Sequence, residues 1–560
     1  MPPDFSQMTA NRPDMDAVTS TYNQLRAKYE GASNTNARVQ VIKRWDKLCQ
    51  DLSTWTSLTR LKFNQDTADD VRKAEREYCD EISPQLLELS VAFKRMLLAD
   101  TNRGDVAEQL GEHAYRLWEA DITTFEPAIS EDLVKLNKLG AEFVELRASA
   151  QIPFQGKTYN LSELRQFFQA PDRAIRKSAQ EARWGWYSDN SEQLDRIFDE
   201  MVRLRQKMAV TIGYENYIPL GYQCMQRVDY SHKDVEFFRD QVVKHVVPLA
   251  TELRRRQADK LGIERLMAWD EPVHDLAGNP RPCGDHDWML SRATEMFDAM
   301  SPELGEFFRM MHNRNLLDLK TREGKAGGGF CTSFPNYDVP FIFANFNGTK
   351  ADVVVFTHEV GHAFQNWMAR DVELSSYTWP TYEAAEIHSM SLEFLTWPHM
   401  EKFFGEDASR FRQIHLLESL LFFPYGVAVD HFQHLVYANP EATPAQRNQM
   451  WLEMEARYLP WRQWGDLEHP SGGGRWQAQS HIYGMPFYYI DYTLALSCAL
   501  QFWDRSEQDY EKALKDYTRL CARGGEAPFQ TLAKDSGLIS PFEPGCLERV
   551  VQRARQELGL

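Results

Sequence analysis

Two histidines that stand four residues apart in an apolar segment constrain this chain more than any other feature. His358 and His362 belong to the run VVVFTHEVGHAFQNWMA, and Thr349 with Asp352 just upstream fits a helix start of the capping-box type. On a helix, side chains four residues apart project from one face, a single turn from each other. The segment therefore predicts a helix that runs into the core and presents two imidazole rings side by side.

The order His-Glu-x-x-His is the spacing that lets two histidine nitrogens reach one zinc ion at about 2.0–2.1 Å. Glu359 follows the first histidine directly, where its carboxylate is placed to take a proton from water that the metal activates. With 15 histidines among 560 residues, chance predicts roughly 0.03 matches to this pattern in the chain. Uncompensated histidine and glutamate side chains would also be costly in a hydrophobic helix. We therefore interpret the motif as a metal site.

A catalytic zinc site takes a third protein ligand and leaves its fourth position open for water. The next helical segment carries Glu383, Glu386 and Glu393 on one stripe. Glu383 and Glu386 lie 21 and 24 residues beyond His362, and the spacing alone does not choose between them. His388 points to another side of the same helix, so we expect it to be a neighbour of the site rather than a ligand.

Most of the remaining chain shows helical periodicity. Residues 129–143 and 191–208, for example, carry apolar side chains at intervals of three and four. Residues 331–347, CTSFPNYDVPFIFANFN, instead alternate and are rich in aromatic residues, which is typical of β-structure. Gly328 and Gly329 precede them and indicate a place where another backbone approaches closely. We therefore expect a mainly α-helical fold with one small sheet beside the HExxH helix.

Composition and charge exclude several classes of function. Lys and Arg total 63 against 81 Asp and Glu, and the resulting net charge of -18 makes nucleic acid a poor partner. We expect no membrane span, because no run of about 18 apolar residues occurs, and no secretory signal at the amino terminus. The eight cysteines are scattered without a C-x-x-C pair, which argues against a disulfide framework and a cysteine-ligated zinc site. We expect a reducing, cytoplasmic compartment.

The residues around the motif resemble a known family. HEVGHAFQ followed by EAAEIHSMSLEF is similar to the zinc site of the thimet oligopeptidase / oligoendopeptidase F family of zinc metallopeptidases, closest to the oligoendopeptidase F / Pz-peptidase branch. In that family the third ligand and a further glutamate follow at the spacing of Glu386 and Glu393, which Glu383 does not match. Other similar stretches cover most of the chain from about residue 130: GKAGGGFCTSF, PFIFANFNGT, IGYENYIPLGYQCMQRVDY and YNLSELRQFFQAPDRAIRKSAQEA.

The resemblance implies an architecture and a class of substrate. The family fold has two mostly helical lobes around a deep channel with zinc at its floor, and the channel admits short peptides but not folded proteins. We expect an N-terminal helical domain over residues 1–195 and a catalytic HExxH domain over residues 196–560. The Gly-rich strand at Gly328 and Gly329 would accept the peptide as an added strand.

The family also places a histidine and several tyrosines downstream, where they contact the tetrahedral intermediate. The matching stretch here begins at His481 and is one residue shorter than in the thimet branch, so two registers remain. One pairs Tyr489 with Tyr492, and the other pairs Tyr488 with Tyr492. The predicted catalytic residues are Glu359, His481, Tyr489 and Tyr492; the predicted substrate-binding residues are Gly328, Gly329 and Tyr488; the predicted zinc ligands are His358, His362 and Glu386.

These residues predict a zinc-dependent oligoendopeptidase that binds one zinc ion per chain and cuts internal bonds of short peptides. One alternative is a zinc carboxypeptidase on the same type of helix, although such enzymes typically carry His-Glu-Ser-Gln where this chain has Glu-Ile-His-Ser. A second is a peptide-binding protein that has lost catalysis. A further metal site at His431 and His434 rests only on their three-residue spacing, and we expect these two to be packing and surface residues.

Overall fold

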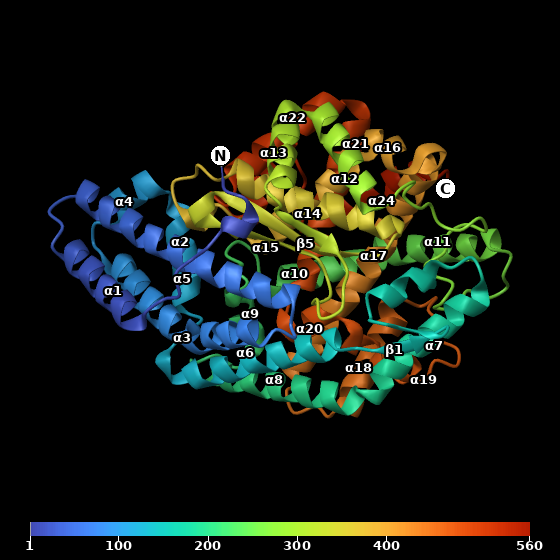
Figure 1. Ribbon diagram of the computed structural model, residues 1–560, viewed down its shortest axis with the longest axis horizontal. Coiled ribbons are helices and arrows are strands. Elements are labelled where there is room, and N and C mark those ends of the chain that lie inside the picture. The colour runs from blue at the N-terminus through green and yellow to red at the C-terminus, as the bar shows by residue number, and fades with distance from the viewer. Residues whose placement is uncertain (1) are drawn as a thin grey trace.

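The computed structural model describes residues 2–560, and helices dominate it (Figure 1), as the sequence predicts. The periodic segments form α6 and α8 with the expected placement. The helices of the first half are α1 (Met15–Glu30), α2 (Thr35–Gln65), α3 (Asp70–Ala99), α4 (Arg103–Leu110), α5 (Glu112–Ile122), α6 (Ser130–Ala148), α7 (Arg173–Asp189), α8 (Ser191–Thr211), α9 (Tyr217–Cys224), α10 (His232–Gln241), α11 (Val247–Lys260), α12 (His286–Met300) and α13 (Pro302–Asn313).

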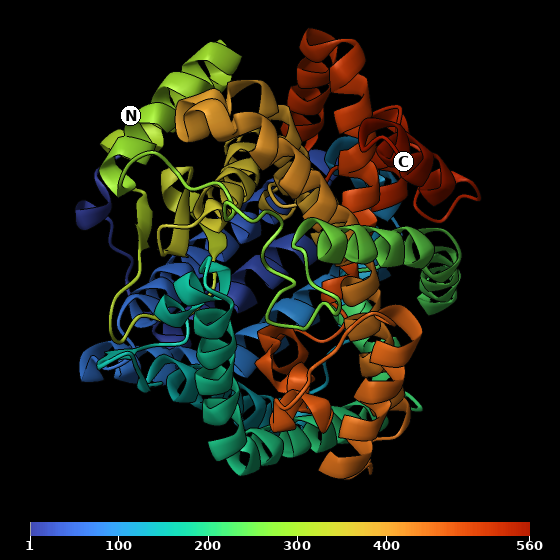
Figure 2. The ribbon, with the colours of Figure 1, turned by 90° about the vertical axis from the view of Figure 1, so that its right-hand side faces the viewer.

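The second half continues in the same manner after a small sheet. Its helices are α14 (Lys350–Met368), α15 (Tyr382–Leu395), α16 (Glu401–Phe404), α17 (Ala408–Ala438), α18 (Pro444–Tyr458), α19 (Glu468–Ser471), α20 (Ser480–Gly484), α21 (Tyr489–Gln508), α22 (Tyr510–Arg523), α23 (Phe529–Asp535) and α24 (Cys546–Glu557). Figure 2 shows α22–α24, in red, at the end of the molecule opposite α7 and α8, in teal.

Short 3-10 and π-helical turns link these helices. They are η1 (Phe5–Gln7), η2 (Pro127–Ile129), η3 (Glu163–Gln169), η4 (Val242–Val246), η5 (Pro335–Tyr337), η6 (Ser375–Tyr377), η7 (Trp397–His399), η8 (Gly405–Asp407) and η9 (Gly474–Ala478).

The strands form two small sheets. β1 (Ile152–Phe154) and β2 (Lys157–Tyr159) make an antiparallel hairpin. β3 (Leu317–Lys320), β4 (Phe330–Phe334) and β5 (Val339–Phe346) form the sheet predicted beside the motif helix, in the order β3-β5-β4. β5 pairs with β3 in parallel and with β4 antiparallel. β4 is therefore an edge strand, whose outer backbone groups have no strand partner in this sheet.

A stack of four helices lies behind this sheet. α14 packs on β4, β5 and α15; α15 packs on α21; and α21 packs on α17. Nearly every residue of α15 is buried, including its glutamates and its histidine. A helix buried on all sides normally carries apolar residues. The buried polar side chains of α15 therefore call for partners, which the neighbouring helices supply.

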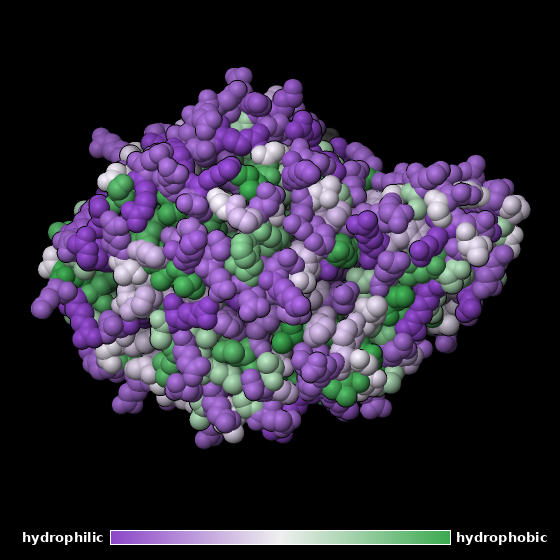
Figure 3. Space-filling view, turned by 180° about the vertical axis from the view of Figure 1, so that it is seen from behind, coloured by the Kyte–Doolittle hydropathy of each residue, from purple (hydrophilic) through white to green (hydrophobic). Residues whose placement is uncertain are grey.

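The surface is mainly polar, with hydrophobic residues scattered over the face seen in Figure 3. Between residues 2 and 560, no helix is both long enough and apolar enough to span a bilayer. A large hydrophobic core extends from Met8 to Ala554, and a second core joins α1–α5 to Leu374 and Tyr377. The division predicted at residues 195/196 falls inside α8 and stays a prediction.

Candidate metal centre

The turn before α14 is fixed by Asp352. Its carboxylate accepts hydrogen bonds from the backbone N–H groups of Asn347, at 3.0 Å, and Gly348, at 2.7 Å. The Thr349 side chain makes no bond to the helix N-terminus and donates instead to Asn347 Oδ1, at 2.8 Å. The predicted capping box is therefore wrong for Thr349, because its hydroxyl finds a nearer acceptor, whereas Asp352 does anchor the entry of the helix.

Gly361 lets the next helix approach the two histidines. A Cβ atom at this position would lie 2.6 Å from Ser389 Cα and 2.7 Å from the backbone oxygen of His388. Both distances are too short for any side chain, so only glycine allows the backbones of α14 and α15 to touch here. The glycine within the HExxH motif thus brings the glutamates of α15 to the histidines of α14.

Three predicted ligands meet at this contact. Oε2 of Glu386 lies 3.1 Å from Nε2 of His358 and 3.3 Å from Nε2 of His362. One donor atom from each residue falls within 4.8 Å of the others, and within residues 2–560 no other group of three such side chains does so. Two imidazoles and a carboxylate are the donor set of a catalytic zinc site with an open fourth position. The three residues therefore fit a zinc ion.

The charges of the cluster are strongly coupled. Burial opposes ionisation of Glu386, but the neighbouring His362 and His358 outweigh it and hold the pKa of this carboxyl well below its ordinary value. Burial likewise disfavours charged His358, yet Glu386 and Glu393 raise the pKa of that imidazole well above its ordinary range. Negative charge is thus concentrated beside the histidine nitrogens, where a cation would bind.

Glu393 holds the first histidine from behind. Its Oε1 lies 2.7 Å from Nδ1 of His358, and its Oε2 lies 2.8 Å from Nε2 of His415 on α17. His415 in turn accepts a hydrogen bond at Nδ1 from the indole of Trp397, at 2.9 Å. Sequence reasoning placed Glu393 near the site but missed His415 and Trp397, because neither lies in a recognisable spacing from the motif.

Glu359 faces a different environment. Burial raises the pKa of its carboxyl, and its Oε2 is buried without a hydrogen-bond partner among the described residues. Gly329 lies directly in front of it, since a Cβ there would come within 3.3 Å of Glu359 Oε1 and 3.2 Å of Val355 Cγ1. A carboxylate of raised pKa beside histidines that fit a metal ion is a candidate general base.

His481 reaches the cluster through Tyr492, whose hydroxyl lies 3.2 Å from its Nε2. On the other side, Nε2 of Gln479 lies 2.8 Å from Nδ1 of His481, and Oε1 of Gln479 accepts a hydrogen bond from Tyr425, at 2.8 Å. The amide nitrogen therefore donates to Nδ1, which leaves the ring proton on Nε2. Burial lowers the pKa of His481 to about 4, so the ring is a neutral donor at physiological pH.

The three candidate tyrosines take different directions. The Tyr488 hydroxyl donates a short hydrogen bond to Oε1 of Glu386, and Tyr492 lies beside His481. Tyr489 packs against Phe422 and Tyr425, with ring centroids 5.7 and 5.8 Å apart. The geometry therefore brings the Tyr488–Tyr492 pair to the cluster, and places Tyr489 in the aromatic packing next to it.

The other histidines and acids considered from the sequence lie elsewhere. His431 Nδ1 contacts the Tyr458 hydroxyl at 2.9 Å, and His434 Nε2 contacts that of Tyr222 at 3.2 Å, so both serve packing, as expected. Both nitrogens of His388 are buried without a hydrogen-bond partner in the described chain. The Glu383 carboxylate accepts a hydrogen bond from Thr381, at 3.1 Å, away from the histidine pair.

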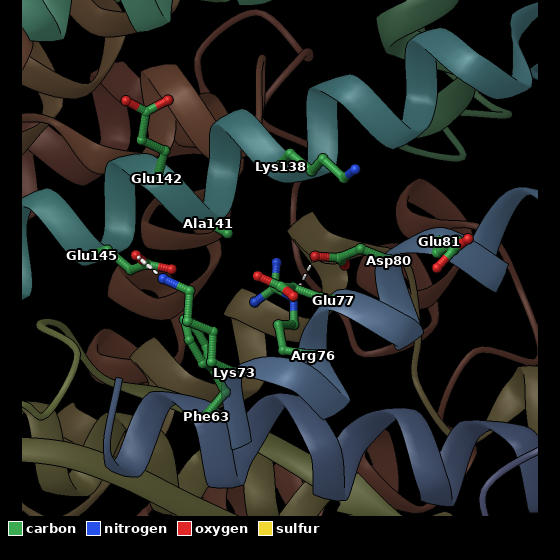
Figure 4. A pocket seen from close by; sticks show the side chains of 10 residues that line it. All are labelled: Phe63, Lys73, Arg76, Glu77, Asp80, Glu81, Lys138, Ala141, Glu142 and Glu145. Atoms are coloured by element: carbon green, nitrogen blue, oxygen red, sulfur yellow. Dashed lines mark hydrogen bonds and ion pairs between the residues drawn. The ribbon is translucent and has the colours of Figure 1, made fainter. Parts of the chain in front are cut away.

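A separate cavity of about 420 Å³ lies between α3 and α6 (Figure 4). Its lining contains no residue of the histidine–glutamate cluster. Lys73 of α3 pairs with Glu145 of α6 across it, at 2.7 Å, and Arg76 pairs with Asp80 along α3, at 2.8 Å. Acidic and basic side chains thus alternate around the lining, which has no metal-binding cluster among its described residues.

Comparison with protein families gives two matches. The profile of the Peptidase M3 N-terminal domain matches residues 5–125, and that of Peptidase family M3 matches residues 166–275 and 292–550. No curated protein matches the chain.

Solved structures match over nearly the whole length. The structure of Pz peptidase A with an inhibitor is 43% identical, with a TM-score of 0.98, and the alignment covers 99% of each chain. A candidate oligoendopeptidase F is also 43% identical at a TM-score of 0.98, covering 100% of this chain and 99% of that one. A candidate oligoendopeptidase F from Bacillus anthracis str. Ames is 40% identical at 0.93, covering 99% and 98%.

Proposed function

Since this chain belongs to peptidase family M3, which confirms the resemblance seen in its sequence, we propose that it is a zinc-dependent oligoendopeptidase. The substrates are short peptides, cut at internal bonds. One observation carries the proposal: two histidine nitrogens converge on a single oxygen of Glu386, beside the buried, unpartnered carboxylate of Glu359. The scattered cysteines, all free thiols, support action in a reducing, cytoplasmic compartment.

His358, His362 and Glu386 are the residues that would hold the zinc ion. When bound, zinc supplies Lewis acidity, which lowers the pKa of water and polarises the peptide carbonyl. Glu393 fixes the His358 ring through Nδ1, so that Nε2 presents its lone pair toward the metal. Tyr488 donates a hydrogen bond to Oε1 of the Glu386 carboxylate, and Ser389 donates one to Oε2, at 2.7 Å.

Glu359 moves the proton. Its carboxylate takes a proton from the water that attacks the scissile carbonyl and then passes it to the leaving amine. The raised pKa of Glu359 suits both steps, because the group binds the proton more readily than an exposed glutamate does. Gly329 keeps the space before this carboxylate free for water and peptide.

Neutral donors would stabilise the negative charge that develops on the carbonyl oxygen. Tyr492 and the Nε2–H of His481 lie next to each other and carry no charge at physiological pH. Preorganised donors of this kind stabilise an oxyanion without moving during the reaction. We assign this role to Tyr492 and His481, with Tyr489 as packing support.

The peptide would bind along the free edge of β4. The segment that leads into this strand contains Gly328 and Gly329, and main-chain hydrogen bonds from a peptide would extend the sheet along this edge. Apolar side chains flank the cluster: Val355 is 36% exposed and Tyr382 is 40% exposed, and large apolar residues are seldom this exposed in the chain. Such accessible apolar groups suit the side chains of a bound peptide.

Mass spectrometry of a mixed-length peptide pool tests the proposal. The zinc-loaded protein should cut short peptides at internal bonds, and Glu359→Gln should retain zinc but lose cleavage. Loss of single residues from the C-terminus would favour the carboxypeptidase alternative. Tight peptide binding without any cleavage by the zinc-loaded wild type would favour a binding protein.

A further inference from the structure

Four arginines from distant parts of the sequence gather on one side of the candidate site. Arg147 ends α6, Arg165 lies in η3, Arg183 in α7 and Arg475 in η9. Arg183 and Arg475 both lie over the Trp184 ring, and Arg183 Cζ lies 5.4 Å from the ring centroid of Phe168 in η3. The charges of the other three arginines also act on Arg183. Figure 1 shows α6, α7 and α20 on the same side of the molecule, and α20 contacts both α6 and η9.

None of these four guanidinium groups forms an ion pair with a carboxylate anywhere in residues 2–560. Several other arginines of this chain, whose net charge is -18, pair with an acid, such as Arg227 with Asp491 at 2.7 Å. One acid that feels the charge of Arg475 is Glu271, which already binds Arg462 at 2.6 Å and Arg254 at 3.2 Å. The cluster therefore carries uncompensated positive charge.

Aromatic rings hold the guanidinium groups in place. Arg183 Cζ lies 4.7 Å from the ring centroid of Trp184, and Arg475 Cζ lies 5.8 Å from the same ring and 4.9 Å from Tyr425. Stacking on aromatic faces orients a guanidinium but leaves its N–H donors unused. Indeed, Arg147 Nε and Arg475 Nη1 are buried without an acceptor in the described chain. Buried donors without acceptors are costly unless a ligand supplies the acceptors.

Solvent reaches the cluster. Arg165 is exposed, and the other three are half-buried. Burial and then Arg147 lower the pKa of the Arg165 guanidinium, so the charge of Arg147 acts on this exposed side chain. All four groups remain charged at neutral pH, because guanidinium is a very weak acid.

Direct contacts join the cluster to the catalytic residues. Arg475 stacks on Tyr425, which binds Gln479, which in turn binds His481. From the opposite side, Asn347 donates to the Ser162 backbone oxygen, at 3.5 Å, next to the start of η3. The η3 segment that carries Arg165 thus lies next to the entry of α14.

We propose that Arg147, Arg165, Arg183 and Arg475 form a subsite that binds a carboxylate of the peptide substrate. The proposal rests on the proposed peptidase function and names the chemistry by which the peptide is held. Guanidinium groups bind carboxylates through paired N–H donors, and such charge-assisted bonds are the strong ones. The carboxylate is either the peptide's C-terminus or an Asp or Glu side chain. Binding of the C-terminus would set how far from that end the bond is cut.

Matched peptides test the subsite. One pair differs only in a C-terminal carboxylate or carboxamide, and a second pair only in one internal Asp or Asn. We expect wild-type kcat/KM to be about tenfold higher for the acid in one of the two pairs, mainly through KM. Arg165→Gln and Arg183→Gln should bring that ratio near one. Arg549→Gln, an exposed arginine of α24 outside the cluster, should keep the wild-type ratio.

The pair that discriminates identifies the source of the carboxylate. Ratios near one for both pairs in the wild type, or a preference that survives in both arginine variants, would overturn the subsite. If the wild type cleaves none of the peptides, the peptidase function fails by itself. Fluorescence anisotropy of the same labelled peptides then tests the subsite by binding alone. Tighter binding of the acid than of the amide, seen only when Arg165 is present, supports the subsite. Equal binding of the two peptides overturns it.

Discussion

The Nδ1 atom of His358 lies 2.7 Å from Oε1 of Glu393, on the side of the ring opposite Glu386. The carboxylate fixes both the orientation and the tautomer of the imidazole, because it accepts the Nδ1 proton and leaves the Nε2 lone pair free. Glu393 is itself held by His415. The metal centre therefore depends on a chain of contacts that reaches from α14 through α15 to α17.

Glu393→Gln should weaken zinc binding by about tenfold or more, because the neutral amide orients His358 less strongly. Competition with a zinc chelator measures the affinity directly. Glu383→Gln is the matched control on the same helix. Burial, followed by Asp491, raises the pKa of Glu383 well above its ordinary value, so glutamine resembles the protonated acid present there. Equal loss of zinc affinity in the two variants would contradict the assignment of Glu393.

Gly329→Ala should reduce kcat/KM by about tenfold or more at unchanged zinc content. The new methyl group would press on Glu359 and Val355, and small displacements of a reacting group are costly in rate. Gly327→Ala is the control, because a Cβ there meets only Ser162 Oγ, at an ordinary 3.6 Å. Steady-state kinetics on one peptide compares kcat/KM of the two variants. An equal loss of kcat/KM in both would contradict a specific effect of the Gly329 methyl group on Glu359.

His481→Gln should lower kcat by about a hundredfold, the loss typical of removing one oxyanion donor. Because burial lowers the pKa of His481 to about 4, the ring stays neutral from about pH 5 upward. The profile of wild-type kcat against pH should therefore contain no step near pH 6.5 that is due to His481. Any step near that pH should appear in the variant as well. Such a step, absent in His481→Gln, would identify a charged histidine and contradict the neutral-donor role.

Asp270→Asn should destabilise the fold by about 3 kcal/mol, because it removes the charge that faces two arginines. Asp270 is fully buried and binds Arg173 at 2.7 Å and Arg176 at 2.9 Å, which ties the segment after α11 to α7. Burial alone would raise the pKa of Asp270, but hydrogen bonds from Arg173 and Arg176 outweigh it and lower the pKa.

The pH dependence of this effect follows from the lowered pKa. The ionised carboxylate contributes stability above the unfolded-state pKa of about 3.9, and the contribution is lost as pH falls through the lower folded-state value. Urea denaturation should therefore show the full difference between wild type and Asp270→Asn above about pH 5 and a smaller one in acid. A difference that grows as pH falls would contradict the ion-pair account.

The helices and the sheet could be predicted because their patterns are local. The alternation before β5 and the periodicity of α6 and α8 are readable from neighbouring residues. The third zinc ligand, Glu383 or Glu386, could not be chosen from neighbouring residues in the sequence. Residues three apart lie on the same face of a helix, so the pattern of α15 does not separate the two carboxylates, and only the packing against α14 decides which of them meets the histidines.

The rest of the site depends on contacts between distant segments. His415 reaches Glu393 from α17, and the four arginines come from α6, η3, α7 and η9. No spacing in the sequence links them, since each is brought into place by the packing of whole helices. The orientation of the tyrosines was unpredictable for a similar reason: Tyr488 and Tyr489 are neighbours, and the start of α21 alone determines which one faces Glu386.

The most direct test of this account is anomalous X-ray diffraction at the zinc absorption edge from crystals of the zinc-loaded protein. We predict one strong peak about 2.0–2.2 Å from Nε2 of His358, Nε2 of His362 and the carboxylate of Glu386. The same peak should be absent in Glu386→Gln crystals and present in Glu383→Gln crystals. A peak at another position, such as His431 and His434, with none at the α14–α15 contact, would contradict the account.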